Sequence, residues 1–200
     1  METFKSKIYN RIENWDSKYV FTANDFLDIA DYETVRKSLN RMVLSGDVRR
    51  IIKGFYYKPK YISLIDEYEA PVAHEVAKAI ARKYNWTIAP SGNTALNILG
   101  LSTQVPAKWT YVSDGRYADF SYGKVTIRFK HRNNGEISNI SFLSSMVIQA
   151  LKALGKDSVT EKHIRHLSKI LSADNKIKLL EEGKSTSAWV YRVIKKICEG

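Results

Sequence analysis

Residues 32–59, YETVRKSLNRMVLSGDVRRIIKGFYYKP, decide the fold of the N-terminal part of the chain. The first half of this stretch predicts a helix over residues 32–45. Gly46 is placed to end that helix, because glycine adopts the left-handed conformation without a Cβ penalty. The second half is rich in β-branched and aromatic residues around Gly54, which predicts a two-stranded hairpin. A helix followed directly by a basic hairpin is typical of the second half of a winged helix-turn-helix.

Two further helices are expected before this stretch. A first helix over residues 3–15 is predicted by an apolar stripe with spacings of four, four and three residues: Phe4, Ile8, Ile12 and Trp15. A second, short helix over residues 25–30 can be capped by Thr22 or Asn24, whose side-chain oxygens accept bonds from the free amides of the first turn. Three short helices and a hairpin in this order predict a winged helix-turn-helix over residues 1–60.

The third helix has a polar face suited to DNA. With successive residues about 100 degrees apart, Val35, Leu39 and Met42 form its buried stripe. Asn pairs with adenine and Arg with guanine through two hydrogen bonds, and Lys binds phosphate or guanine. The residues on the opposite face and its edge are Arg36, Lys37, Asn40 and Arg41. The hairpin and its end add cations where a wing meets the DNA backbone or minor groove: Arg49, Arg50, Lys53, Lys58 and Lys60. The alternative interpretation is a solvated basic surface.

The charge balance favours a polyanionic partner. The chain has 200 residues, 44% of them hydrophobic, and a formal net charge of +11. Residues 36–60 contain eight Lys or Arg and a single acid, Asp47. Such a local excess favours DNA, RNA or an acidic lipid surface without choosing among them.

The pattern changes beyond Pro59, and we place the domain boundary between Lys60 and Glu69, where apolar periodicity lapses. The expected elements are helices over residues 70–84, 94–99, 141–154, 160–171, 174–182 and 186–198, and strands over residues 86–88, 109–112, 118–122 and 124–130. The sequence therefore predicts an α+β protein. A mixed α+β domain with a helical C-terminus, residues 61–200, follows the winged helix-turn-helix.

Several classes of protein are disfavoured. A single cysteine, Cys198, excludes an intrachain disulfide or a Cys-rich zinc site and suits a reducing compartment. The N-terminus lacks the apolar run of a secretory signal, so we expect a cytoplasmic protein. The uncharged stretch of residues 84–107 contains prolines, glycines and polar residues that a lipid-facing helix would not tolerate. We predict no membrane segment.

No sequence motif indicates an enzyme or a cofactor site. His163 and His166 share a helical face but lack a third metal ligand at matching spacing. Ser91 lacks the glycine two residues earlier that a nucleophile elbow requires. Asp114 and Asp119 are interpreted as turn-flanking acids rather than a catalytic pair. We predict no catalytic residue, no metal site and no cofactor.

Two segments together resemble the AbiEi-type antitoxins of bacterial abortive-infection operons, a type IV toxin-antitoxin family with short relatives. The first is GDVRRIIKGFY at residues 46–56. The second, and more specific, is PSGNTALNILGLSTQVP at residues 90–106, followed by YVSDG at residues 111–115. The resemblance extends from the N-terminus to about Arg132. It implies that the winged helix binds operator DNA and represses its own operon, while the rest opposes a nucleotidyltransferase-type toxin without necessarily contacting it.

Two alternatives to an antitoxin stay open. One is a plain winged-helix transcription regulator whose second domain senses a ligand or dimerises. The other is an enzyme or RNA-binding accessory protein whose basic C-terminal part acts on nucleic acid. The apolar face of the last predicted helix, residues 186–198, is expected to pack on its own domain. The alternative for that face is docking of a partner protein or of a second copy, which would make a homodimer.

Overall fold

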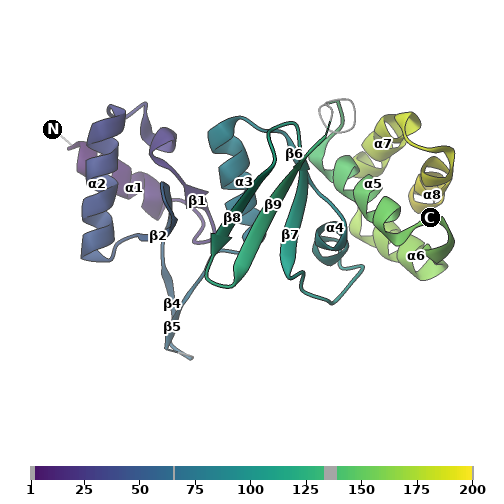
Figure 1. Cartoon of the computed structure of the whole chain (residues 1–200), viewed down its shortest axis with the longest axis horizontal. Helices are drawn as coiled ribbons and strands as arrows, with labels where there is room; N and C mark the ends of the chain where they lie inside the picture. The colour runs from purple at the N-terminus through teal and green to yellow at the C-terminus, as the bar shows by residue number, and fades with distance from the viewer. Residues whose placement is uncertain (1–2, 65, 133–138, 200) are drawn as a thin grey trace. The chain divides into compact units, whose positions relative to one another are not determined.

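The computed structural model describes residues 3–64, 66–132 and 139–199 and confirms an α+β protein (Figure 1). The chain forms two compact units. The first unit extends to Asn85 and includes residues 121–123, and the second contains the remainder. Within the described residues, no helix is long and apolar enough to cross a bilayer.

The first unit contains the predicted order of helices and hairpin. Its elements are α1 (Phe4–Glu13), β1 (Val20–Phe21), the 3-10 helix η1 (Ala23–Phe26), α2 (Tyr32–Ser45), β2 (Arg49–Ile52), β3 (Phe55–Tyr57), β4 (Lys60–Ile62), β5 (Glu67–Glu69) and α3 (Ala73–Tyr84). The strands β1, β3 and β2 form an antiparallel sheet in that order, with Val20 opposite Tyr57 and Arg50 opposite Tyr56. The winged-helix-like arrangement is therefore confirmed.

Helix α2 has the bounds and the buried face that its sequence predicts. Asp31 caps its first turn by accepting a hydrogen bond from the amide of Thr34 at 3.0 Å. Gly46 ends it in the left-handed conformation, with φ 85°. Its buried side chains are Val35, Leu39 and Met42. They pack in one core cluster with Ile8 and Ile12 of α1, so the opposite face of α2 is left for solvent.

The second predicted helix is shorter and begins earlier than expected. Thr22 and Asp25 form a capping box around η1, which ends at Phe26 rather than at Ala30. The amides of Ile29 and Ala30 both bond to the carbonyl of Phe26, which turns the chain toward the start of α2. The tight connection to α2 thus uses residues that the sequence pattern assigned to the helix.

The first unit extends beyond the boundary that we expected between Lys60 and Glu69. Residues 60–69 form an antiparallel hairpin, β4 with β5, which the lapse in apolar periodicity did not predict. Helix α3 then packs with β1. The Arg82 side chain of α3 bonds to the Asp25 carboxylate at 3.0 Å and to the Val20 carbonyl at 2.8 Å. These contacts explain why α3 belongs to the winged-helix unit.

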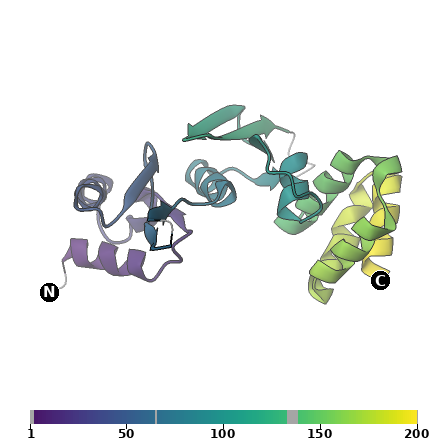
Figure 2. The same cartoon turned by 90° about the horizontal axis from the view of Figure 1, so that it is seen from below.

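The second unit combines a mixed sheet with a helical cluster. Its elements are β6 (Ile88–Pro90), α4 (Asn93–Ile98), β7 (Lys108–Ser113), β8 (Ala118–Tyr122), β9 (Val125–His131), α5 (Phe142–Leu154), the 3-10 helix η3 (Lys156–Ser158), α6 (Glu161–Ile170), α7 (Ala173–Glu182), the 3-10 helix η4 (Gly183–Ser185) and α8 (Ala188–Glu199). The strand order is β6-β7-β9-β8, with β7 parallel to β9. Figure 2 shows helices α5 to α8 gathered together.

The helical cluster has its own apolar core, into which α4 inserts. Ala95 and Leu99 are buried there with residues of α5, α6, α7 and α8, whereas Leu96 and Ile98 are only partly buried against it. The predicted apolar face of the last helix packs here through Val190, which is fully buried. The face therefore covers its own unit, as expected.

Candidate nucleic-acid interface

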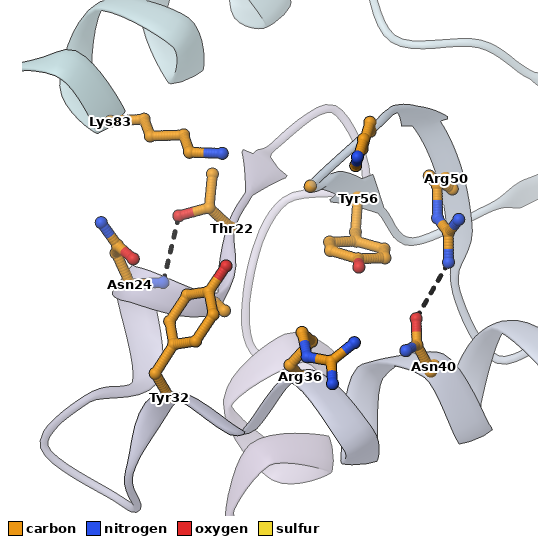
Figure 3. Close-up of a pocket in the computed structure, with 11 residues that line it drawn as sticks. Thr22, Asn24, Tyr32, Arg36, Asn40, Arg50, Tyr56 and Lys83 are labelled. Carbon is orange, nitrogen blue, oxygen red and sulfur yellow. Dashed lines mark hydrogen bonds between the residues drawn. The ribbon is translucent and has the colours of Figure 1, made fainter. Parts of the chain in front are cut away.

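A concave pocket in the first unit is formed by α2, the β2–β3 hairpin, η1 and the C-terminal end of α3 (Figure 3). Its volume is about 190 Å³. That is below the roughly 300 Å³ at which pockets for drug-sized ligands begin. The pocket is lined by Thr22, Ala23, Asn24, Tyr32, Arg36, Asn40, Arg50, Lys53, Gly54, Tyr56 and Lys83. The pocket can therefore take a small group such as a phosphate.

The pocket is strongly cationic. Four of its lining side chains are Lys or Arg, and none of the described residues that line it is acidic. Of these four cations, only Arg36 pairs with the carboxylate of a described residue, Glu33, at 2.7 Å on the outer surface of α2. That contact raises the pKa of Arg36 and lowers the pKa of Glu33. A low-dielectric concavity lined by one sign of charge attracts an anion.

The wing and α2 are bonded to each other at this pocket. The Arg50 guanidinium donates to the Asn40 side-chain oxygen at 2.9 Å (Figure 3). It also lies 5.7 Å from the centre of the Tyr56 ring. Four of the eight predicted DNA-binding residues, Arg36, Asn40, Arg50 and Lys53, thus share one pocket.

Lys83 is the pocket cation that the sequence analysis missed. Its amine lies 4.7 Å from the centre of the Phe55 ring. Partial burial lowers its pKa. A basic residue in the last turn of a helix ordinarily signals only a favourable interaction with the helix dipole. No local pattern distinguishes Lys83 from such a residue, because its neighbours in the pocket, from Thr22 to Tyr56, lie at least 27 residues earlier (83 minus 56).

Two predicted residues lie on α2 outside the pocket. Lys37 and Arg41 are exposed on the helix surface. They are not among the residues that line the pocket. Their side chains extend the cationic face of α2 beyond the concavity.

The other two predicted residues have different partners. The Arg49 guanidinium stacks on the Tyr68 ring of β5, 3.9 Å from its centre. Lys58 forms an ion pair with Glu13 of α1 at 2.8 Å. Arg49 and Lys58 are therefore both engaged in contacts within the protein. The sequence could not indicate this, because Tyr68 belongs to the unpredicted hairpin and Glu13 lies 45 residues away.

The residues considered for catalysis or metal binding have structural contacts. His166 Nε2 lies 2.8 Å from the Leu99 carbonyl, and His163 Nδ1 accepts the amide of Thr160 at 3.2 Å. The Asp119 carboxylate pairs with Arg128 at 2.6 Å. In the described parts of the chain, no group of three or more His, Cys, Asp or Glu side chains is placed to hold a metal ion.

Comparison with known proteins gives a family match and a similarity to a solved structure. The profile of a protein family described as "Family of unknown function (DUF6088)" matches residues 7–179. No curated protein matches the sequence. Among solved structures, the crystal structure of the RV2827C protein from Mycobacterium tuberculosis is similar, with a TM-score of 0.40 and 12% sequence identity. The match covers 100% of this chain and 77% of that one.

Proposed function

Because the chain belongs to DUF6088, a family of unknown function, we infer its function from its geometry and propose that its first unit binds double-stranded DNA. One observation carries this proposal: the cationic pocket lies beside the exposed polar face of α2. At its edge, Arg50 of the wing is hydrogen-bonded to Asn40 of α2. A helix with exposed Lys, Arg and Asn beside a basic hairpin has the chemistry that major-groove reading requires.

In the proposed complex, α2 lies in the major groove. Arg41 and Lys37, both exposed, would reach base edges or phosphates, and Asn40 would read adenine. Arg50 and Lys53 of the wing would contact the backbone, which sets the register of the protein on the duplex. The target we propose is the operator of the chain's own gene.

We further propose that the chain is an antitoxin, with the second unit opposing a nucleotidyltransferase-type toxin. The support is the resemblance to AbiEi-type antitoxins at residues 90–106, which the structure assigns to β6, α4 and the following loop of the second unit. Stable contact with the toxin is not required by this proposal. A plain regulator would bind DNA equally well but would give no protection.

A binding titration tests the DNA-binding role. Full-length protein is titrated onto a duplex carrying its own promoter region and onto a scrambled duplex of equal length, at several salt concentrations. We expect affinity for both to fall as salt rises, because Lys and Arg contacts release counterions from phosphates. Preference for the promoter should survive at moderate salt. Equal affinity for the two duplexes would contradict operator recognition and indicate a basic surface that binds DNA without sequence preference.

Co-expression tests the antitoxin role. The full chain, made from an unrelated promoter, is produced together with the product of the neighbouring gene, and growth is measured. We expect growth to be restored both by the wild type and by Asn40→Ala combined with Arg41→Ala, because protection would come from the second unit. Repression without restored growth would favour the plain regulator.

A further inference from the structure

The pocket contains a cation from outside the predicted winged helix-turn-helix, and its position is unusual. Lys83 projects from the end of α3 toward the turn between β2 and β3 (Figure 3). A Cβ built on Gly54, in that turn, would lie 3.0 Å from the Lys83 amine. The amine therefore rests directly against the backbone of the wing. Gly54 has φ +81°, so glycine serves both this turn and the close approach of the lysine.

Lys83 has no anionic partner among the described residues. The ion pairs of α3 are formed by its other cations, Lys78 with Glu75 and Arg82 with Asp25. Besides the backbone at Gly54, the Lys83 amine lies over the rings of Phe55 and Tyr84, at 4.7 and 5.8 Å from their centres. A half-buried ammonium without a carboxylate is a cost to folding that an incoming anion would offset.

Lys53, in the hairpin turn, is a second lysine that lines the same pocket. It is exposed, and no ion pair joins it to any described acid. The side chains of Asn24 and Tyr32 also line the pocket and can donate hydrogen bonds. Two lysines with neutral donors, in a space too small for a cofactor, suit a phosphate group, which lysine binds as a point charge.

We propose that Lys83 and Lys53 form a phosphate seat, defined by these two residues and Gly54, that holds one backbone phosphodiester of the bound duplex. This inference rests on the proposed DNA-binding function and extends its interface to α3. The DNA-binding unit is then residues 1–85 rather than 1–60. The seat lies beside the wing and the first turns of α2, where a phosphate contact would fix the position of the recognition face.

The test measures the salt dependence of duplex binding by full-length Lys83→Gln, Lys53→Gln and Lys78→Gln. Each variant removes one positive charge. Lys78 lies on the same helix as Lys83 but pairs with Glu75 outside the pocket, so it is the matched control. Losing one phosphate contact reduces the slope of log affinity against log salt by about 0.9, which corresponds to about five-fold weaker binding near 0.15 M salt.

We expect this reduction for Lys83→Gln and Lys53→Gln, on promoter and scrambled duplexes alike, and near wild-type behaviour for Lys78→Gln. Lys83→Arg should retain the slope, because the charge is kept. Lys53 is exposed, so its variant tests the seat even if Lys83→Gln is less stable. Wild-type slopes in both glutamine variants would overturn the seat while leaving the proposed function intact. Failure of the wild type to bind either duplex would remove both.

A second arm separates a duplex phosphate from a free one. Inorganic phosphate is titrated into wild type and Lys83→Gln, and binding is followed by phosphorus NMR. Weak binding to the wild type that a saturating duplex displaces would support the seat. Phosphate binding that depends on Lys83 but is unaffected by duplex would overturn it, because the site would then serve a free phosphorylated ligand.

Discussion

The Arg50 guanidinium donates a hydrogen bond to the Asn40 side-chain oxygen at 2.9 Å, which ties the wing strand β2 to helix α2. A guanidinium has only donors, so the amide oxygen of Asn40 must face it and its NH₂ group points elsewhere. Reading adenine uses both ends of the amide. Because an amide oxygen has two lone pairs, Asn40 can accept from Arg50 and from adenine at the same time, and the remaining donors of Arg50 can bind a phosphate.

The first prediction concerns base reading. Asn40→Ala and Arg41→Ala should each reduce the preference for the operator by about 1–3 kcal/mol, if each side chain makes a two-bond contact with a base. Lys53→Ala should weaken binding to all duplexes alike. Competition gel shifts with operator and scrambled DNA measure the ratio. An unchanged ratio in the Asn40 and Arg41 variants would place the recognition face elsewhere.

The second prediction concerns the packing of Trp86 on Gly115. A Cβ at position 115 would lie 2.3 Å from the Trp86 ring atoms Cδ2 and Cε2, and the rigid ring also packs edge-on against Phe129 at 5.4 Å. Gly115→Ala should lower the free energy of unfolding by about 1–3 kcal/mol through overpacking. Urea denaturation followed by tryptophan fluorescence measures it. Double replacement Gly115→Ala with Trp86→Leu should lose less than the sum of the single changes, and simple additivity would contradict the contact.

The third prediction concerns acid stability through His74 of α3. Burial first, and then the charge of Lys78, lower its pKa from 6.5 to about 4, against an opposing effect of Glu75. Between pH 6.5 and 4 the unfolded chain binds more protons than the folded one, so stability falls as the pH falls through this range. We expect a loss of roughly 1–2 kcal/mol, allowing for partial exposure.

Comparing His74→Gln with the wild type isolates this contribution. The variant cannot titrate, so its thermal stability should fall less than that of the wild type between pH 7 and 4.5. Parallel pH profiles for the two proteins would show that His74 is not protonated differently in the folded and unfolded states.

The fourth prediction concerns the segment that carries the antitoxin resemblance. Leu99 is 5% exposed in the core of the helical cluster, whereas Val105 in the same segment is 76% exposed. Leu99→Ala should cost about 2–5 kcal/mol of stability, and Val105→Ala should stay within roughly 0.5 kcal/mol of wild type. Chemical denaturation measures both. In cells that make the neighbouring toxin, Leu99→Ala should lose protection while Val105→Ala keeps it. If a destabilised Leu99 variant still protected the cells fully, protection would not depend on this core.

Local patterns were sufficient to predict α2, its end at Gly46 and the hairpin after it. The apolar spacing, the cap and the left-handed glycine act within a few residues, so they can be recognised without knowing the rest of the fold. The same reasoning missed β4 and β5. Their facing residues, Lys60 with Glu69 and Tyr61 with Tyr68, form a short exposed hairpin without an apolar alternation.

The sequence by itself determined which face of α2 is free and that it is cationic, because the buried stripe of Val35, Leu39 and Met42 leaves only one face for solvent. Only the tertiary structure decided which cations share the pocket. It added Lys83 from α3, and it turned Arg49 toward Tyr68 and Lys58 toward Glu13. The physical reason is the sequence separation between a cation and its partners. A Lys or Arg side chain is long and flexible, so its position depends on partners that are distant in sequence and that only packing brings close.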